Sequence, residues 1–133
     1  MMFRQISGAT TRWFVMAVAM LLVSISHAQT AAQDPIEAGA AALARGHSAT
    51  AYRAWIDLAR AGNAQAQNNI GYLHEHGLGL SQSYQSAMEW YRKAADKNLP
   101  QAQYNIGTLY YYGYGVERNA REAVRWFRQA AKQ

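Results

Sequence analysis

Small and apolar residues recur at helical spacing in two stretches of the chain. In the first stretch the recurring positions lie four, three and four residues apart, which predicts a helix with one apolar face that ends at a glycine. These positions are Ala66, Ile70, Leu73 and Gly77. The same series returns 36 residues later as Ala102, Ile106, Leu109 and Gly113. We therefore predict one such helix in each of two repeats.

A second apolar face follows each of these helices. Its members are Ala87, Trp90, Tyr91, Ala94 and Ala95 in the earlier stretch and Ala123, Trp126, Phe127, Ala130 and Ala131 in the later one. Ser83 and Asn119 precede the two faces, and both residue types are favoured N-caps. Glu122 stands three residues after Asn119, which is the spacing of a capping box. Each repeat is thus predicted to be a pair of helices.

The two stretches are copies of one unit. Residues 62–97 and 98–133 share 14 of 36 positions, and a period in the thirties is typical of helix-pair solenoids. A degenerate pair precedes them, with expected helices at 36–44 and 51–61. We predict an all-α, right-handed helix-turn-helix solenoid with two full 36-residue repeats plus one degenerate N-terminal helix pair. Its units span residues 36–62, 63–97 and 98–133.

Glycine recurs at matching places in both repeats. Gly77 and Gly79, like Gly113 and Gly115, lie between the two helices of a pair. A Gly-x-Gly step can belong to a phosphate loop, but that loop needs a preceding strand, and the sequence gives no strand signal. A left-handed helix end is the better explanation. Glycine also occurs inside the first helix of each repeat, at positions 71 and 107, where we expect the partner helix to approach closely.

The N-terminus has the pattern of an export signal. Residues 13–25 carry no charge, Arg4 and Arg12 precede them, and Ser26-His27-Ala28 resembles a cleavage site. We predict a signal peptide over residues 1–28, a flexible leader over 29–35, and a periplasmic or secreted protein. The alternative is a retained membrane anchor, although the apolar run is shorter than the ~20 residues of a spanning helix.

The remaining chemistry argues against an enzyme. The chain has no cysteine, and no nucleophile elbow is evident. His74 and His76 are two residues apart, so on a helix their rings point in different directions, and we expect neither a metal nor a cofactor. The formal net charge of +5 falls to +3 without residues 1–28, and an exported protein with so mild a charge is not expected to bind nucleic acid.

A basic stripe is expected on the last helix. It consists of Arg121, Arg125, Arg128 and Lys132, which follow one another at helical spacing. An ordinary solvated helix surface explains such a stripe, and attraction to an anionic partner is the alternative.

The repeats resemble the Sel-one-like repeat (SLR) family, relatives of the tetratricopeptide solenoids. The residues that carry the resemblance in the later repeat are Ile106, Gly107, Tyr110, Gly113, Gly115, Val116, Ala123, Trp126, Phe127, Ala130 and Ala131. The earlier repeat has His74 where the family has tyrosine, and Ser83 and Asn119 replace its aspartate. The resemblance covers about residues 36–133 and implies an all-α adaptor that binds proteins.

In tetratricopeptide-like pairs the first helix lines the concave face, which gives a set of candidate partner-binding residues. They are Asn69, Tyr72, Tyr104, Asn105, Tyr111 and Tyr112. Asn69 and Asn105 occupy the same repeat position, so we expect a short amide ladder. The predicted partner is a protein or peptide of the cell envelope. A cell-wall or carbohydrate-binding module and an accessory regulator of an envelope enzyme are the alternatives. We also expect self-association through the uncapped C-terminal end. Once the signal peptide is cleaved, we expect no stable insertion in the membrane.

Overall fold

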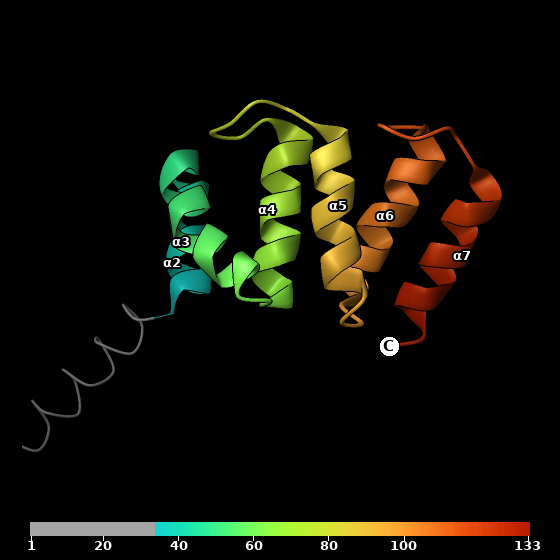
Figure 1. Cartoon of the computed structure of the whole chain (residues 1–133), viewed down its shortest axis with the longest axis horizontal. Coiled ribbons are helices and arrows are strands. Elements are labelled where there is room, and N and C mark those ends of the chain that lie inside the picture. Colours follow the sequence, from blue (N-terminus) through green and yellow to red (C-terminus); the bar gives the residue numbers. More distant parts are fainter. Residues whose placement is uncertain (1–33) are drawn as a thin grey trace, which may run out of the picture. The chain divides into compact units, whose positions relative to one another are not determined.

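The computed structural model describes residues 34–133, which form six α-helices and no strand (Figure 1). The predicted all-α class is confirmed. The signal peptide over residues 1–28 and nearly all of the leader lie outside the described residues. The helices are α2 (Pro35–Ala44), α3 (Ser48–Arg60), α4 (Ala64–His76), α5 (Tyr84–Ala95), α6 (Pro100–Tyr112) and α7 (Ala120–Ala131).

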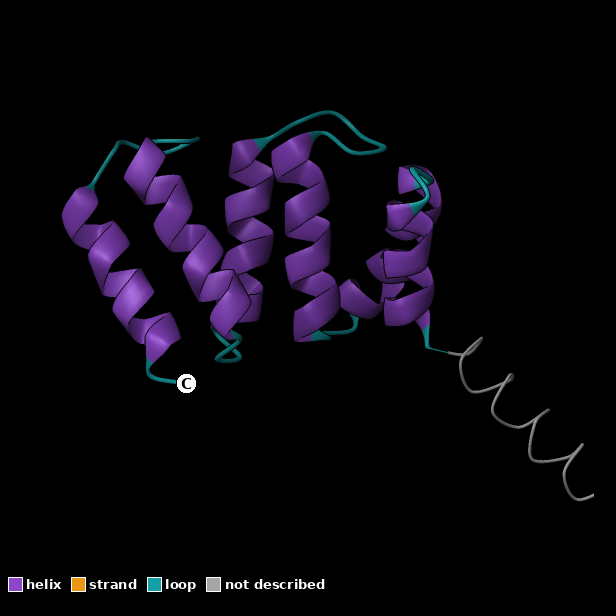
Figure 2. Ribbon diagram, turned by 180° about the vertical axis from the view of Figure 1, so that it is seen from behind, coloured by secondary structure: helices purple, strands orange, loops and turns teal. Residues whose placement is uncertain are grey.

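Each helix packs against the helices that precede and follow it in the chain. The views in Figures 1 and 2 agree that α4, α5, α6 and α7 stand side by side in chain order. The helices form three pairs, α2 with α3, α4 with α5, and α6 with α7. Contacts between consecutive pairs join them into a helix-pair solenoid.

The first glycine of each Gly-x-Gly step ends a helix. Gly77 and Gly113 are the C-caps of α4 and α6, with left-handed φ angles of 63° and 75°. The amide N–H of Gly113 donates to the carbonyl oxygen of Leu109 at 2.9 Å, which satisfies an acceptor at the helix end. The predicted helix-ending role of these two glycines is confirmed.

The second glycine has a further role that the sequence did not suggest. A Cβ on Gly79 would lie 2.8 Å from the amide nitrogen of Ala49, at the start of α3. A Cβ on Gly115 would lie 2.6 Å from Cβ of Tyr84, at the start of α5. Each loop therefore lies directly against the first turn of the second helix in the preceding pair, and only glycine leaves room for that contact.

Both predicted N-caps are present. The side chain of Ser83 accepts from the amide of Ser86, and Asn119 accepts from two amides in the first turn of α7. The capping box is only half formed, however. The N–H of Asn119 donates to the carbonyl oxygen of Tyr110, and the carboxylate of Glu122 forms an ion pair with Arg125 at 3.2 Å. Asn119 thereby connects the start of α7 to the end of α6.

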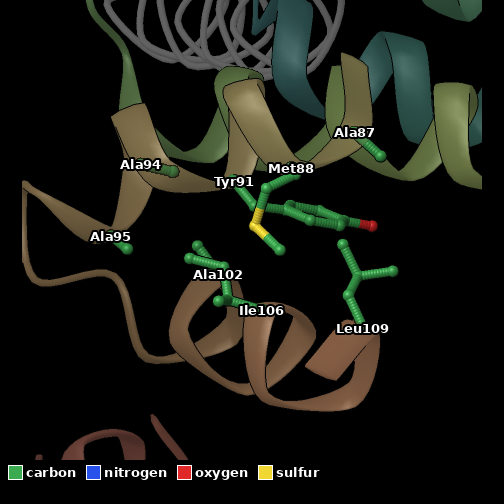
Figure 3. Close-up of a cluster of buried hydrophobic side chains, with 8 residues drawn as sticks. All are labelled: Ala87, Met88, Tyr91, Ala94, Ala95, Ala102, Ile106 and Leu109. Atoms are coloured by element: carbon green, nitrogen blue, oxygen red, sulfur yellow. The ribbon is translucent and has the colours of Figure 1, made fainter. Parts of the chain in front are cut away.

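The glycines inside α4 and α6 allow aromatic rings to lie on the helix backbone. A Cβ on Gly71 would be 2.7 Å from the ring of Tyr91, and a Cβ on Gly107 would be 2.6 Å from the ring of Phe127. The predicted close approach is confirmed. Figure 3 shows the core between α5 and α6, whose buried members are Ala87, Met88, Tyr91, Ala94, Ala95, Ala102, Ile106 and Leu109.

The face of α7 that corresponds to this core is open. Met88 of α5 is 6% exposed beneath α6, whereas Val124, which holds the same position in α7, is 45% exposed. Trp126, Phe127 and Ala130 are half-buried and Ala131 is exposed. Apolar surface of the kind that joins two pairs elsewhere in the molecule is thus accessible on α7.

Candidate interaction groove

A shallow hollow of about 330 Å³ lies over α4 and α6, and its lining is mostly aromatic. We call it the tyrosine groove. It is lined by Tyr72, Glu75, His76, Tyr104, Asn105, Thr108, Tyr111, Tyr112 and Phe127. Five of the six candidate residues from the sequence are among them. Asn69 is the exception.

The helical pattern explains why these side chains gather there. Ile70 and Leu73 of α4 are fully buried, as are Ile106 and Leu109 of α6. Residues on the opposite side of the same helices must then point outward. Since α4 and α6 are the first helices of consecutive pairs, their outward faces line one surface.

The tyrosines of the groove leave much of their surface accessible. Tyr72 is 40% exposed, Tyr104 58%, Tyr111 46% and Tyr112 57%. The rings nevertheless have defined neighbours. The ring centroid of Tyr104 lies 5.2 Å from that of Phe127, and Tyr111 meets Tyr112 edge-on at 5.0 Å. Such contacts fix the rings in position, which lowers the entropy lost when a ligand binds.

The expected amide ladder between Asn69 and Asn105 is wrong. Asn69 accepts a hydrogen bond from Gln65 within its own helix. The side-chain amide of Asn105 instead donates to Oδ1 of Asn68 at 3.0 Å. Asn68 is only 8% exposed, so the bond joins two pairs at the edge of the groove. The two asparagines are 37 residues apart, and a comparison at the 36-residue period therefore selects the wrong partner.

Sequence reasoning did not predict the contact between Glu75 and Tyr91. The hydroxyl of Tyr91, on α5, donates to Oε2 of this groove residue at 2.6 Å. Burial of the ring, followed by this hydrogen bond and the charge of Glu75, raises the pKa of Tyr91 well above its usual range. Tyr91 therefore remains a donor at every physiological pH, and it holds one carboxylate oxygen in a fixed place. No repeat pattern signals the pair, because the next repeat has Phe127 and Tyr111 at the two positions.

The histidines behave as separate groups. Nδ1 of His74 is buried and has no hydrogen-bond partner, whereas Nδ1 of His76 lies 3.0 Å from the carbonyl oxygen of Tyr72. Burial lowers the pKa of His74, and the nearby charge of Glu89 opposes that effect. Within residues 34–133, no three His, Asp or Glu side chains are placed to hold a metal ion together.

A larger depression, of about 710 Å³, lies along α7. All four residues of the predicted basic stripe line it, together with Glu122, Val124 and Gln129. Every one of these side chains comes from α7 or its C-cap residue, Lys132. The tyrosine groove combines side chains of three helices, which favours it as the candidate site.

These features define a class of protein: an all-α solenoid of helix pairs whose first helices line a groove. The Sel1 repeat model matches residues 64–99 and 100–133. Together these segments make up more than half of the chain, which therefore belongs to the Sel1 repeat family, as the sequence resemblance indicated. The matched segments correspond to α4 with α5 and α6 with α7.

Two solved structures are similar to this chain. A Sel1 repeat protein from Oxalobacter formigenes is 36% identical with a TM-score of 0.69, over 75% of this chain and 40% of that one. A protective antigen from uropathogenic Escherichia coli strains, which displays an SLR fold, is 42% identical with a TM-score of 0.61. The match covers 63% of this chain and 18% of the antigen. This chain thus spans less than half the length of either relative. No curated protein sequence matches it significantly.

Proposed function

We propose that this protein is an exported scaffold, an adaptor or a regulatory subunit, that binds a protein or peptide of the cell envelope in the tyrosine groove. Sel1 repeat proteins generally mediate protein–protein interaction, and the fold is typically a non-catalytic scaffold. The observation that carries the proposal is the gathering of four exposed tyrosines from α4 and α6 in one hollow. Exposed, positioned aromatic residues are typical anchors of protein interfaces.

The hydrogen-bonding groups of the groove suit a peptide chain. Asn105 and Thr108 lie among the tyrosines, and amide and hydroxyl groups can both donate and accept. Their presence beside apolar ring faces matches the mixed surface of an extended peptide, which offers backbone polar groups and side chains alternately.

Export is the second component of the proposal. It is supported by the basic, apolar and small-residue order of residues 1–28. None of the helices in residues 34–133 has the length and apolar character needed to cross a bilayer. We therefore propose that the scaffold is periplasmic or secreted.

The groove is tested with a double substitution, Tyr104→Ala with Tyr111→Ala. The purified protein serves as bait in an envelope extract, and any captured protein is then purified and titrated directly. We expect the double variant to bind at least roughly 30-fold more weakly, which corresponds to ~2 kcal/mol. Tyr114→Ala is the control, because Tyr114 is 41% exposed and does not line the groove. Its ring stacks on that of the groove residue Tyr112 at 5.3 Å, so this variant measures how much binding is lost through an indirect effect. Circular dichroism should be the same for all three proteins.

The same variants distinguish the alternatives. Equal affinity of the wild type and the double variant for the captured protein would show that the partner does not bind in the groove. In the other outcome, no protein is captured, the wild-type protein is retained on isolated peptidoglycan, and the double variant is not retained. That result would make the groove a cell-wall binding site, since tyrosine rings also stack on sugars.

A further inference from the structure

The tyrosine groove contains a negative charge that forms no ion pair with a cationic side chain of residues 34–133. Glu75 lines the groove, and Tyr91 uses one acceptor position of its carboxylate. A carboxylate can accept about four hydrogen bonds. In the part of the chain that the structure describes, the ion pairs are Arg60 with Asp57 and Arg125 with Glu122. Neither involves Glu75.

A structural role alone does not require this charge. The buried hydroxyl of Tyr91 needs one acceptor, which a neutral amide would provide. The next repeat needs no acceptor at this place, because Phe127, the equivalent of Tyr91, has no hydroxyl, and Tyr111 is the equivalent of Glu75. The hydroxyl and the carboxylate thus occur together in one repeat and are both absent from the other. This pairing fixes an anion at one end of the groove.

Aromatic side chains line the same hollow as that anion. Tyr72 precedes Glu75 by nearly one helical turn, and Tyr104 lines the same hollow from α6. The faces of tyrosine rings attract cations electrostatically. Tyr111 already illustrates this attraction, because the guanidinium carbon of Arg118 lies 6.0 Å from its ring centroid. A carboxylate beside exposed aromatic faces is a combination that binds an ammonium or guanidinium group.

We propose that the tyrosine groove binds a lysine or arginine side chain of its partner, with Glu75 as the anionic contact and Tyr72 and Tyr104 as the aromatic walls. This inference rests on the proposed function, and it states the chemistry of the residue that the groove selects. The partner segment is a peptide that carries a basic residue between uncharged ones, since the chain itself has a net positive charge that disfavours a uniformly basic ligand.

The probe is a phage-displayed library of random peptides, selected on the purified protein. We expect the selected peptides to share one lysine or arginine. A synthetic peptide with norleucine in its place should bind roughly tenfold more weakly or worse, because it loses a charge-assisted hydrogen bond. In the Glu75→Gln variant, the two peptides should bind about equally. The Glu75→Gln change keeps a hydrogen-bond acceptor for the hydroxyl of Tyr91. The comparison of the basic peptide with the norleucine peptide is made on the wild-type protein, so it does not depend on how any variant folds.

The control is Glu117→Gln, which removes the same charge at an exposed position outside the groove. It should preserve the preference for the basic peptide. Two results would overturn this inference and leave the proposed function standing. In the first, the selected peptides need Tyr104 and Tyr111 for binding but share no lysine or arginine. In the second, the preference for the basic peptide over the norleucine peptide is the same in the Glu75→Gln variant as in the wild type. A library that yields no peptide dependent on the groove tyrosines would overturn both.

Discussion

The side-chain amide of Asn105 donates a 3.0 Å hydrogen bond to Oδ1 of Asn68, and this contact joins the first helices of two consecutive repeats. We expect Asn105→Ala to destabilise the protein by about 1–2 kcal/mol, because it leaves the nearly buried Asn68 without this partner. Asn69→Ala is the control. Its partner, Gln65, lies on the same helix, so the loss should stay below about 0.5 kcal/mol. Urea denaturation measures both, and equal losses would contradict the inter-repeat role.

Substitution of Gly71 or Gly107 by alanine should change the stability of the protein by different amounts, although the local geometry of the two glycines is alike. Alanine favours a helix over glycine by ~1 kcal/mol, but its Cβ would collide with an aromatic ring at either site. Tyr91 is fully buried and tethered to Glu75, whereas Phe127 is half-buried on the open helix α7. We expect Gly71→Ala to lose about 2 kcal/mol and Gly107→Ala to stay within about 1 kcal/mol of the wild type. Thermal denaturation would contradict this explanation if it ranked the variants in the opposite order.

The stability of the protein should depend on pH through His74. Burial lowers the pKa of His74 in the folded state, so the unfolded chain binds the proton more readily. Stability is therefore complete above the ordinary histidine pKa of about 6.5 and decreases as the pH falls from there toward the folded-state value. His74→Tyr, which introduces the residue that the next repeat has at Tyr110, should flatten the dependence between neutral and mildly acidic pH. Melting curves with the same slope for both proteins would exclude His74 as the cause.

The open face of α7 is expected to support weak self-association. Val124 is the exposed counterpart of the buried Met88, and Val124→Arg would place a charge in the middle of that apolar surface. Sedimentation velocity at increasing concentration should show association of the wild type and its loss in the variant. Thr50→Arg adds the same charge at an exposed position of α3 and should have no effect. A wild-type protein that remains monomeric at high concentration would refute the expectation.

Export predicts a defined N-terminus. Mass spectrometry of the periplasmic or secreted protein should find a chain that starts at Gln29, with or without cyclisation of that residue, because the cleavage motif ends at Ala28. Full-length protein recovered only from the cytosol would contradict both the signal peptide and the envelope setting of the proposed function.

The helix pairs could be predicted from the sequence because their causes are local. Buried positions such as Ile106 and Leu109 follow helical spacing, and Gly113 and Asn119 mark helix ends with residue types that suit few other conformations. The outward position of Tyr104 and Tyr111 followed from the same spacing. Local patterns therefore predicted most of the lining of the groove.

Contacts between elements could not be predicted in the same way. The bond between Asn68 and Asn105 is displaced by one residue from the repeat period. The bond between Tyr91 and Glu75 depends on how deeply one ring enters between two helices, and no spacing rule encodes that depth. Internal similarity identifies which residues are equivalent, and it does not identify which residues touch.

The contact of Gly115 with the first turn of α5 has a consequence for how such an array can change in length. Each loop is held against the pair before it, with no room for even one Cβ atom. A short insertion in the loop would displace that contact, whereas duplication of a complete 36-residue unit would reproduce it at the new boundary. We therefore expect this architecture to lengthen by whole units and to tolerate few intermediate sizes.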